Sequence, residues 1–397
     1  MSELSYLEKL LDGVEVEWVT LGSMADIGTG SSNRQDESEN GIYPFYVRSK
    51  NILKSDTFEF DEVAIVIPGE GGIGDIFHYV EGKYALHQRA YRIRITTNAV
   101  DTKFLYYFMS SSFKQYILTK SVGATAISIR KPMLEGFKVP IPSPDNPEKS
   151  LAIQSEIVRI LDKFTALTAE LTAELNMRKK QYNYYRDQLL SFKEGEVNWT
   201  TLGNEELFHI CAGGTPSKSK AEYWDNGSIP WLKSESCNNK PVYFSKDFIS
   251  ELGLKKSTAK LLPKNTTLIA LVGATIFKTA FLEFEATTNQ NIASIKSTKE
   301  NIIADKFIFY FLTNLYNTLK SEMRNYGMLN LTNLRQFRIP IPCIAEQKRI
   351  VSILDKFDAL TNSITEGLPR EIELRQKQYE YYRDLLFSFP KPGTVSN

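Results

Sequence analysis

The sequence predicts an α+β protein built as a tandem repeat, in which two mixed α/β domains are separated by two long helices packed as an antiparallel coiled coil. Three observations lead to this prediction. The chain repeats itself after about 200 residues, the most similar segments carry apolar residues at heptad spacing, and the segments between them combine short apolar runs with turn residues. We expect the domains at 1–145 and 196–343 and the helical segments at 146–195 and 344–397.

The repeat is clearest where each half of the chain closes. Residues 181–192 read QYNYYRDQLLSF and residues 378–389 read QYEYYRDLLFSF, with nine of twelve positions identical. The segments that begin at Gln154 and Gln347 match at eleven of fifteen positions, and VPIP or IPIP precedes each of them. Each half also opens with a Trp-x-Thr-Leu-Gly motif, and the sequences in between have diverged. A shared scaffold with diverged segments suggests one task carried out on two different targets.

The closing segments predict long helices. From Ile157 to Phe192, apolar and aromatic residues recur at steps of four and three, interrupted only by Thr168 and Arg178. Because this stretch lacks Gly and Pro, we expect one helix of about 45 residues, roughly 68 Å long. Such a helix needs a partner helix, and the second copy is the obvious one. The expected helix interface consists of Ile157, Leu161, Phe164, Leu171, Leu175, Tyr182, Tyr185, Leu189, Ile350, Leu354, Phe357, Tyr379, Tyr382 and Leu386.

Two short features modify these helices. The second copy is four residues longer, and since the extra Gly367-Leu368-Pro369-Arg370 contains Gly and Pro, we expect a break or kink near 367–369. The first copy contains the short repeat TAEL-TAEL at 168–175. One interpretation of this repeat is an ordinary helix-forming surface stretch.

The diverged segments predict mixed α/β domains. Short apolar runs bounded by Gly, Pro, Asn and Ser indicate strands, and longer apolar stretches indicate one helix in each domain. The expected strands include Val63–Ile67, Tyr91–Ile95, Thr267–Val272 and Ile292–Ile295, and the expected helices span 103–117 and 306–323.

The sequence offers little for catalysis. It has no P-loop, no G-x-S-x-G, no H-E-x-x-H and no N/D-P-P-Y/F box of the kind expected in an adenine methyltransferase. The run GEGGIG at 69–74 matches a dinucleotide-binding pattern, but a strand-like segment follows it, so a tight turn between two strands is favoured. The three His and three Cys show no metal-ligand spacing. We therefore expect a binding protein with no catalytic, metal-binding or cofactor-binding residues.

The expected compartment is the cytoplasm. The cysteines Cys211, Cys237 and Cys343 are scattered and too few to pair completely, which is typical of a reducing environment. The N-terminus lacks the basic and apolar regions of a signal peptide, and no run of about 18 apolar residues suggests a membrane span.

Two kinds of segment carry side chains suited to nucleic acid. The turn at 213–216 exposes hydroxyl and Lys side chains that can reach phosphates and base edges, although an ordinary solvated turn is equally consistent. The aligned triplets at 87–89 and 289–291 offer side chains that can pair with guanine or adenine. The candidate DNA contacts are Arg48, Ser49, Lys50, Asn51, His87, Gln88, Arg89, Arg130, Lys131, Thr215, Ser217, Lys218, Lys220, Lys233, Ser234, Asn289, Gln290, Asn291 and Arg335.

The whole pattern resembles the specificity subunit of type I restriction-modification systems. The resemblance rests on the W-x-T-L-G openings, on GGTPS, YW and IPW in the second half, and on PIP followed by Q-x-x-I-V-x-I-L-D-K-F and QYxYYRDxLxSF. One departure is the insertion S-P-D-N-P-E-K after Pro142. A coiled-coil adaptor for proteins or glycans, or an enzyme with an unrecognised site, are the alternatives.

The resemblance implies a division of labour. Each diverged segment is expected to be a target recognition domain that reads one half of a split DNA sequence, and the helices are expected to set the spacer and to dock two modification subunits. Those subunits are expected to carry S-adenosylmethionine chemistry, and a restriction and translocase subunit is expected to use ATP and Mg. This chain itself is expected to be non-catalytic, and the number of TAEL units is expected to set the spacer.

The net charge of +1 and the pI of about 7.6 are lower than is typical of DNA-binding domains, but the charge is unevenly distributed along the chain. Residues 41–138 hold 13 basic and 9 acidic side chains, and residues 196–343 hold 17 and 13. The helical segments are nearly balanced, with 8 against 7 at 146–195 and 8 against 8 at 344–397. Two mildly basic domains and neutral helices therefore predict weak non-specific attraction to phosphates by this chain alone.

Overall fold

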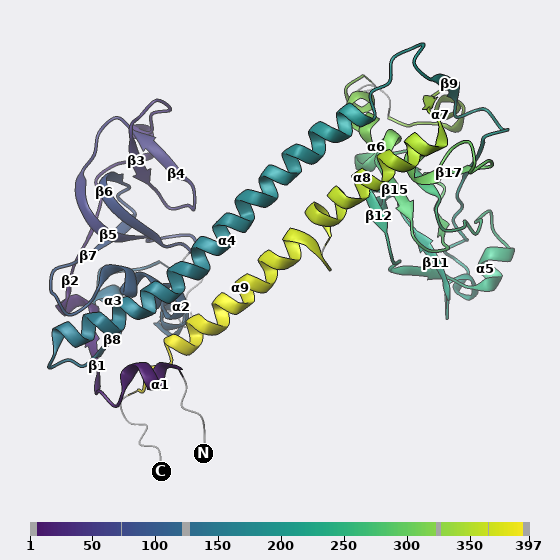
Figure 1. Ribbon diagram of the computed structural model, residues 1–397. Coiled ribbons are helices and arrows are strands. Elements are labelled where there is room, and N and C mark those ends of the chain that lie inside the picture. Colours follow the sequence, from purple (N-terminus) through teal and green to yellow (C-terminus); the bar gives the residue numbers. More distant parts are fainter. Residues whose placement is uncertain (1–5, 73, 121–127, 323–326, 364, 392–397) are drawn as a thin grey trace. The chain divides into compact units, whose positions relative to one another are not determined.

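A computed structural model of the chain describes residues 6–72, 74–120, 128–322, 327–363 and 365–391 (Figure 1). The chain forms two compact units. Unit 1 consists of residues 1–172 and 371–397, and unit 2 consists of residues 173–370. Each unit therefore combines residues from both halves of the repeat, and we describe each unit by itself.

Unit 1 contains the first mixed α/β domain. Its elements are α1 (Tyr6–Leu11), β1 (Val16–Thr20), η1 (Leu21–Ser23), β2 (Ala25–Thr29), η2 (Arg34–Asp36), β3 (Tyr43–Tyr46), β4 (Ile52–Ser55), β5 (Phe60–Pro68), β6 (His78–Leu86), β7 (Ala90–Ile95), α2 (Thr102–Lys120), α3 (Lys131–Glu135) and β8 (Lys138–Pro142). The main sheet has the order β2-β7-β5-β6-β3-β4, and β1 pairs separately with β8. Only β3 and β6 run parallel in the main sheet. The last five residues of β5 are all buried, because α2 packs against β5 and β6.

Unit 2 contains the second domain. Its elements are β9 (Asn198–Thr201), β10 (Phe208–Ala212), η3 (Ala221–Tyr223), β11 (Ile229–Leu232), η4 (Ser234–Ser236), β12 (Lys240–Val242), β13 (Asp247–Ile249), α5 (Glu251–Lys255), β14 (Thr267–Ala270), η5 (Gly273–Thr275), β15 (Thr279–Leu282), β16 (Thr287–Thr288), β17 (Ile292–Ser297), α6 (Asp305–Glu322), α7 (Leu331–Arg335) and β18 (Arg338–Ile341). Its sheets have the orders β10-β17-β14-β15-β12, β13-β11-β16 and β18-β9. Helix α6 packs against β14 and β15, as α2 does against the sheet of unit 1.

The expected strands and domain helices are confirmed. The four predicted strands fall within β5, β7, β14 and β17, although β14 ends at Ala270, two residues earlier than expected. The predicted helices correspond to α2 and to α6, whose described part ends at Glu322. The GEGGIG run lies between β5 and β6, so it joins two strands as expected. Among the helices of the described ranges, none is long and apolar enough to cross a membrane.

The first long helix is continuous and the second is broken. Helix α4 (Pro147–Leu189) has 43 residues, close to the expected length. In the second copy, α8 (Ile344–Asn362) ends before α9 (Gly367–Leu386) begins. The break is confirmed, but it precedes the inserted residues. Pro369 lies in the first turn of α9, where its missing N–H costs nothing because first-turn N–H groups have no intrahelical partner.

Aromatic rings connect the long helices within each unit. In unit 1, Phe164 of α4 stacks on Tyr382 of α9 with 5.3 Å between ring centres. In unit 2, Tyr182 and Tyr185 of α4 contact Phe357 of α8 at 6.2 and 5.7 Å. The antiparallel packing of the helices along their length stays a prediction. A continuous coiled-coil seam along the helices stays a prediction.

The ends of the long helices pack into the domain cores. In unit 1, Ile157, Leu161 and Leu386 are buried in the same core as α2. In unit 2, Ile350 and Leu354 are buried in the same core as α6. Tyr379 packs against the core of unit 1, and Tyr182 and Leu189 pack against that of unit 2, whereas Leu171 and Leu175 are half-buried near the middle of α4. Several residues of the expected helix interface therefore hold a helix end to a domain.

Candidate nucleic-acid interface

One turn is built in the same way in both units. It joins β6 to β7 in unit 1 and β16 to β17 in unit 2. Its first residue, His87 or Asn289, donates its backbone N–H to the carbonyl of Tyr46 or Leu232, at 2.9 Å in both units. The two triplets that align in the sequence therefore occupy the same place in the same scaffold.

The first side chain of each turn is buried. His87 is 7% exposed and Asn289 is 8% exposed. The Nδ1 atom of His87 accepts the backbone N–H of Arg89 at 3.0 Å, and the Oδ1 atom of Asn289 accepts that of Asn291 at 3.1 Å. Burial, together with the positive charges of Arg48 and Arg89, lowers the pKa of His87, so this ring is neutral at pH 7. These two side chains stabilise the turn, which leaves its second and third residues at the surface.

A carboxylate that the sequence did not indicate joins two candidates in unit 1. The Oε2 atom of Glu70 accepts Nη1 of Arg48 at 3.1 Å and Nη1 of Arg89 at 3.2 Å. Arg48 belongs to the loop of the β3–β4 hairpin, and Arg89 belongs to the shared turn. Glu70 therefore brings two sequence-distant candidates into one cluster.

The other candidates of unit 1 surround this cluster. Lys50 and Asn51 are exposed in the hairpin loop, where the hydroxyl of Ser49 donates to the carbonyl of Asn51 at 3.2 Å. Gln88 is exposed between His87 and Arg89.

Two further candidates of unit 1 begin α3. Ile129 donates its backbone N–H to the carbonyl of Gly69 at 2.8 Å, which places Arg130 next to the loop that carries Glu70. Arg130 is the N-cap of α3, and Lys131 pairs with Glu135 at 3.9 Å. The hairpin loop, the shared turn and the start of α3 thus meet on one part of unit 1.

The corresponding part of unit 2 uses uncharged side chains. The hydroxyl of Thr215 donates to the side-chain oxygen of Gln290. The backbone N–H of Gly214 donates to the carbonyl of Thr288 at 2.8 Å, and its own carbonyl accepts the indole N–H of Trp231 at 3.0 Å. These bonds hold the 213–216 turn against the shared turn.

A lysine and a serine follow directly after β11. Lys233 pairs with Asp247 at 2.9 Å and lies over the ring of Trp231, and Ser234 begins η4. Asp247 is the second carboxylate that the sequence did not indicate. The sequence candidates are side chains that donate hydrogen bonds, so the acceptors Glu70 and Asp247 are not among them. One signal for Glu70 was present in the sequence, because the second copy has the apolar Val272 at the corresponding position.

Four candidates of unit 2 lie away from the shared turn. The hydroxyls of Ser217 and Ser219 are 2.8 Å apart, Lys218 is exposed, and Lys220 donates to the hydroxyl of Tyr223 at 3.1 Å. Arg335 ends α7, and its carbonyl accepts the backbone N–H of Gly203 at 2.8 Å. Arg335 therefore does not match Arg130 and Lys131, which lie at the opposite end of the equivalent helix.

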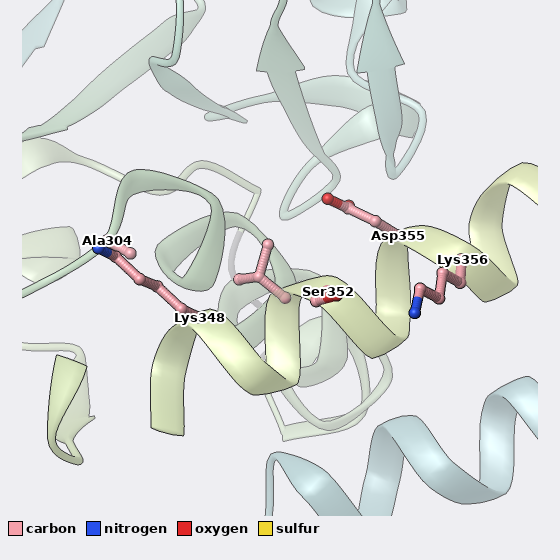
Figure 2. A pocket seen from close by; sticks show the side chains of 6 residues that line it. Ala304, Lys348, Ser352, Asp355 and Lys356 are labelled. Atoms are coloured by element: carbon pink, nitrogen blue, oxygen red, sulfur yellow. The ribbon is translucent and has the colours of Figure 1, made fainter. Parts of the chain in front are cut away.

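A hollow of about 360 Å³ lies on α8 in unit 2 (Figure 2). Lys348, Ser352 and Asp355 line it from the helix. The carboxylate of Asp355 is engaged, because it accepts the hydroxyl of Tyr310 at 2.5 Å and lies 3.0 Å from the Lys306 ammonium. Within the part of the chain that the structure describes, no group of three His, Cys, Asp or Glu side chains could hold a metal ion.

Comparisons with known sequences point to one family. A family model described as type I restriction modification DNA specificity domain matches the chain twice, over residues 13–178 and 196–374. The chain is 45% identical to the specificity subunit of the type I restriction enzymes EcoR124I/EcoR124II of Escherichia coli, over 100% of both chains. It is 35% identical to the EcoprrI specificity subunit of Escherichia coli, over 92% of this chain and 93% of the relative.

Solved structures share the fold. The crystal structure of a type I restriction-modification S subunit from M. genitalium matches with a TM-score of 0.61 at 18% identity, over 96% of this chain and 98% of that one. The HsdS subunit from Thermoanaerobacter tengcongensis matches with a TM-score of 0.51 at 14% identity, over 94% of this chain and 97% of that one. The duplicated arrangement of two domains and long helices is therefore a known fold.

Proposed function

Because the chain belongs to the family of type I restriction-modification DNA specificity subunits, we propose that the shared turn and its surroundings read one half of a split DNA target in each unit. The chain is the non-catalytic DNA sequence-recognition subunit of such a system, with two tandem recognition domains. It assembles with the other subunits of the system and with DNA.

One observation carries the proposal for the turn. Both units hold the turn with the same backbone hydrogen bonds and have Gln at its second position, Gln88 or Gln290, but the third residue differs, with Arg89 in unit 1 and Asn291 in unit 2. Arg pairs best with the O6 and N7 atoms of guanine, and an amide pairs best with adenine. A constant frame with exchangeable readout groups is what two half-sites of different sequence require.

The exchange of one domain tests this proposal. Residues 197–342 are replaced by the equivalent segment of a relative with a different target, and the modified sites are mapped by methylation sequencing in cells that supply the partner subunits. We expect one half of the target to change completely and the other half to remain. A change in both halves, or in neither, would contradict independent reading by the two units, and an adaptor for proteins would show no change in any DNA site.

We also propose that two modification subunits dock on the repeated helices and that a restriction and translocase subunit joins the complex. Tyr184 and Tyr381 support the first point, because they are 62% and 65% exposed and still identical in the two copies. Folding does not require identity at such exposed positions, so one partner present twice explains it better. S-adenosylmethionine, ATP and Mg would then be bound by the partner subunits, in the cytoplasm.

We propose that the helices set the number of base pairs between the half-sites. The boundary between units 1 and 2 falls within TAEL-TAEL, between Thr172 and Ala173. The repeat lies within α4 and outside the sheets of both domains, which supports a spacer role for it.

A further inference from the structure

Glu70 occupies a fixed position between two segments of unit 1. The preceding residue, Gly69, donates its backbone N–H to the carbonyl of Arg89 at 2.9 Å and accepts the N–H of Ile129 at 2.8 Å. Glu70 itself forms a β-bridge with Ser128. The residue at the equivalent place in unit 2, Leu271, makes the same two contacts, because it donates its N–H to the carbonyl of Asn291 at 2.8 Å and accepts the N–H of Leu329 at 2.8 Å. These contacts therefore fix the backbone from which the Glu70 side chain extends.

The carboxylate contacts two cations at the surface of unit 1. Glu70, Arg48 and Arg89 are about half exposed, with side-chain exposures of 45%, 46% and 54%. One oxygen of Glu70 accepts a single N–H from each arginine. A guanidinium has five N–H donors, so each arginine keeps most of its donors for another acceptor. The cluster presents two oriented forks with a net charge of +1.

Unit 2 lacks all three members of this cluster. The bridge between Glu70 and Ser128 corresponds to that between Val272 and Met328. Arg89 corresponds to Asn291 in the shared turn, and Arg48, two residues after Tyr46, corresponds to Ser234, two residues after Leu232. The carboxylate and both arginines are thus replaced together on a backbone that is otherwise retained, as expected for three residues that act as one device.

We infer that Glu70 is a specificity-determining residue of unit 1, which positions Arg48 and Arg89 for base edges and limits their attraction to phosphates. The inference rests on the proposed reading of DNA by the shared turn. Without Glu70 the cluster would carry one more positive charge and its guanidinium groups would lose their orientation. Non-specific attraction would then rise while cognate binding would fall.

The test compares Glu70→Gln with Asp75→Asn in the complex with its partner subunits. Both substitutions remove one negative charge from the connection between β5 and β6. Among the residues that the structure describes, Asp75 pairs with Lys114 alone, at 2.7 Å, and both side chains are about half exposed. This ion pair is therefore a matched control that contains no arginine of the cluster. For E70Q we expect the ratio of cognate to non-specific binding to fall about five- to a hundredfold, the range that one misread base pair covers. D75N should keep the ratio of the unaltered protein.

Methylation mapping of the same two variants separates the possible outcomes. E70Q should relax one or more bases in the half-site of unit 1 and leave the half-site of unit 2 unchanged. An unchanged target in E70Q, or equal effects of E70Q and D75N, would overturn the inference while leaving the proposed function intact. If E70Q modifies no site at all, competition binding decides: an equal loss of cognate and non-specific binding overturns the inference, and a selective loss of cognate binding supports it. Failure of the proposed function itself would appear separately, as an unaltered target after the exchange of residues 197–342.

Discussion

Units 1 and 2 bury the same glutamine at the start of their helices and use it in the same way. Gln154 accepts the backbone N–H of Asp101 at 2.8 Å and donates to the carbonyl of Ala99 at 3.0 Å. Gln347 accepts the N–H of Ala304 at 2.9 Å and donates to two carbonyls at 2.8 Å. Both side chains are fully buried. A buried amide that satisfies backbone groups of another segment leaves no freedom for substitution, which explains the identity of this residue in the two copies.

An aspartate that lies eight residues after each glutamine also makes the same contacts in both units. Asp162 accepts the hydroxyl of Tyr107 at 2.6 Å and the ammonium of Lys103 at 2.7 Å. Asp355 accepts the hydroxyl of Tyr310 at 2.5 Å, with Lys306 at 3.0 Å. The lysine and tyrosine come from the K-F-x-x-Y motif that α2 and α6 share. In each unit this contact fastens a long helix to the domain helix.

The two units differ in most of the side chains around the shared turn, although the exposed second residue of the turn, Gln88 or Gln290, is the same in both. Unit 1 presents Arg48, Glu70 and Arg89, and unit 2 presents Thr215 and Gln290. The comparison teaches that identity between the copies has two separate causes. Buried residues are identical because the scaffold requires them, and for the exposed tyrosines of the helices we propose a partner that binds both copies. Three predictions test that division.

The largest effect is expected for Tyr184→Ala and Tyr381→Ala. If one partner docks on each copy, each single variant should lose one of two bound modification subunits, and the double variant should lose both. Truncation of an aromatic anchor typically costs about 2 kcal/mol or more, which is roughly a thirtyfold loss of affinity. Native mass spectrometry of the complex measures the stoichiometry.

Met177→Ala is the control on the same helix. Met177 is 45% exposed, and the second copy has Leu374 at the equivalent position. Its truncation should leave both partners bound. A complex that keeps two partners in the double tyrosine variant would show that identity at exposed positions has another cause.

Shortening TAEL-TAEL by one unit should give a smaller, purely geometric effect. Deletion of residues 172–175 removes about 6 Å of helix, and DNA rises about 3.4 Å per base pair. We expect the preferred spacer to shorten by about one or two base pairs while both half-sites keep their sequences. Methylation sequencing reads the spacer and both half-sites together, and an unchanged spacer in an active complex would exclude the spacer role.

The sequence predicted the helices and strands better than it predicted how the side chains around the shared turn are arranged. The repeat, the long helix α4 and the four strands followed from periodicity, because each depends on many residues in a row. The role of His87 could not be predicted, since its burial depends on segments distant in the chain. Glu70 was passed over for a similar reason: its importance comes from Arg48 and Arg89, which lie 22 and 19 residues away.

The smallest effect is expected for His87→Asn, which gives the shared turn of unit 1 the side chain found at Asn289 in unit 2. The Asn oxygen can still accept the N–H of Arg89, so stability at pH 7.5 should change by less than about 1 kcal/mol. Burial and two nearby arginines lower the pKa of His87 in the folded state. The unfolded chain therefore binds more protons below its ordinary pKa of about 6.5, and stability should be lost as the pH falls from about 7 to 5. Urea unfolding at pH 7.5 and 5.5 should show a smaller acid loss for H87N than for the unaltered protein. His209→Asn, at an exposed position of unit 2, should retain the full acid loss. Equal acid losses in all three proteins would mean that protonation of His87 does not contribute to the loss of stability in acid.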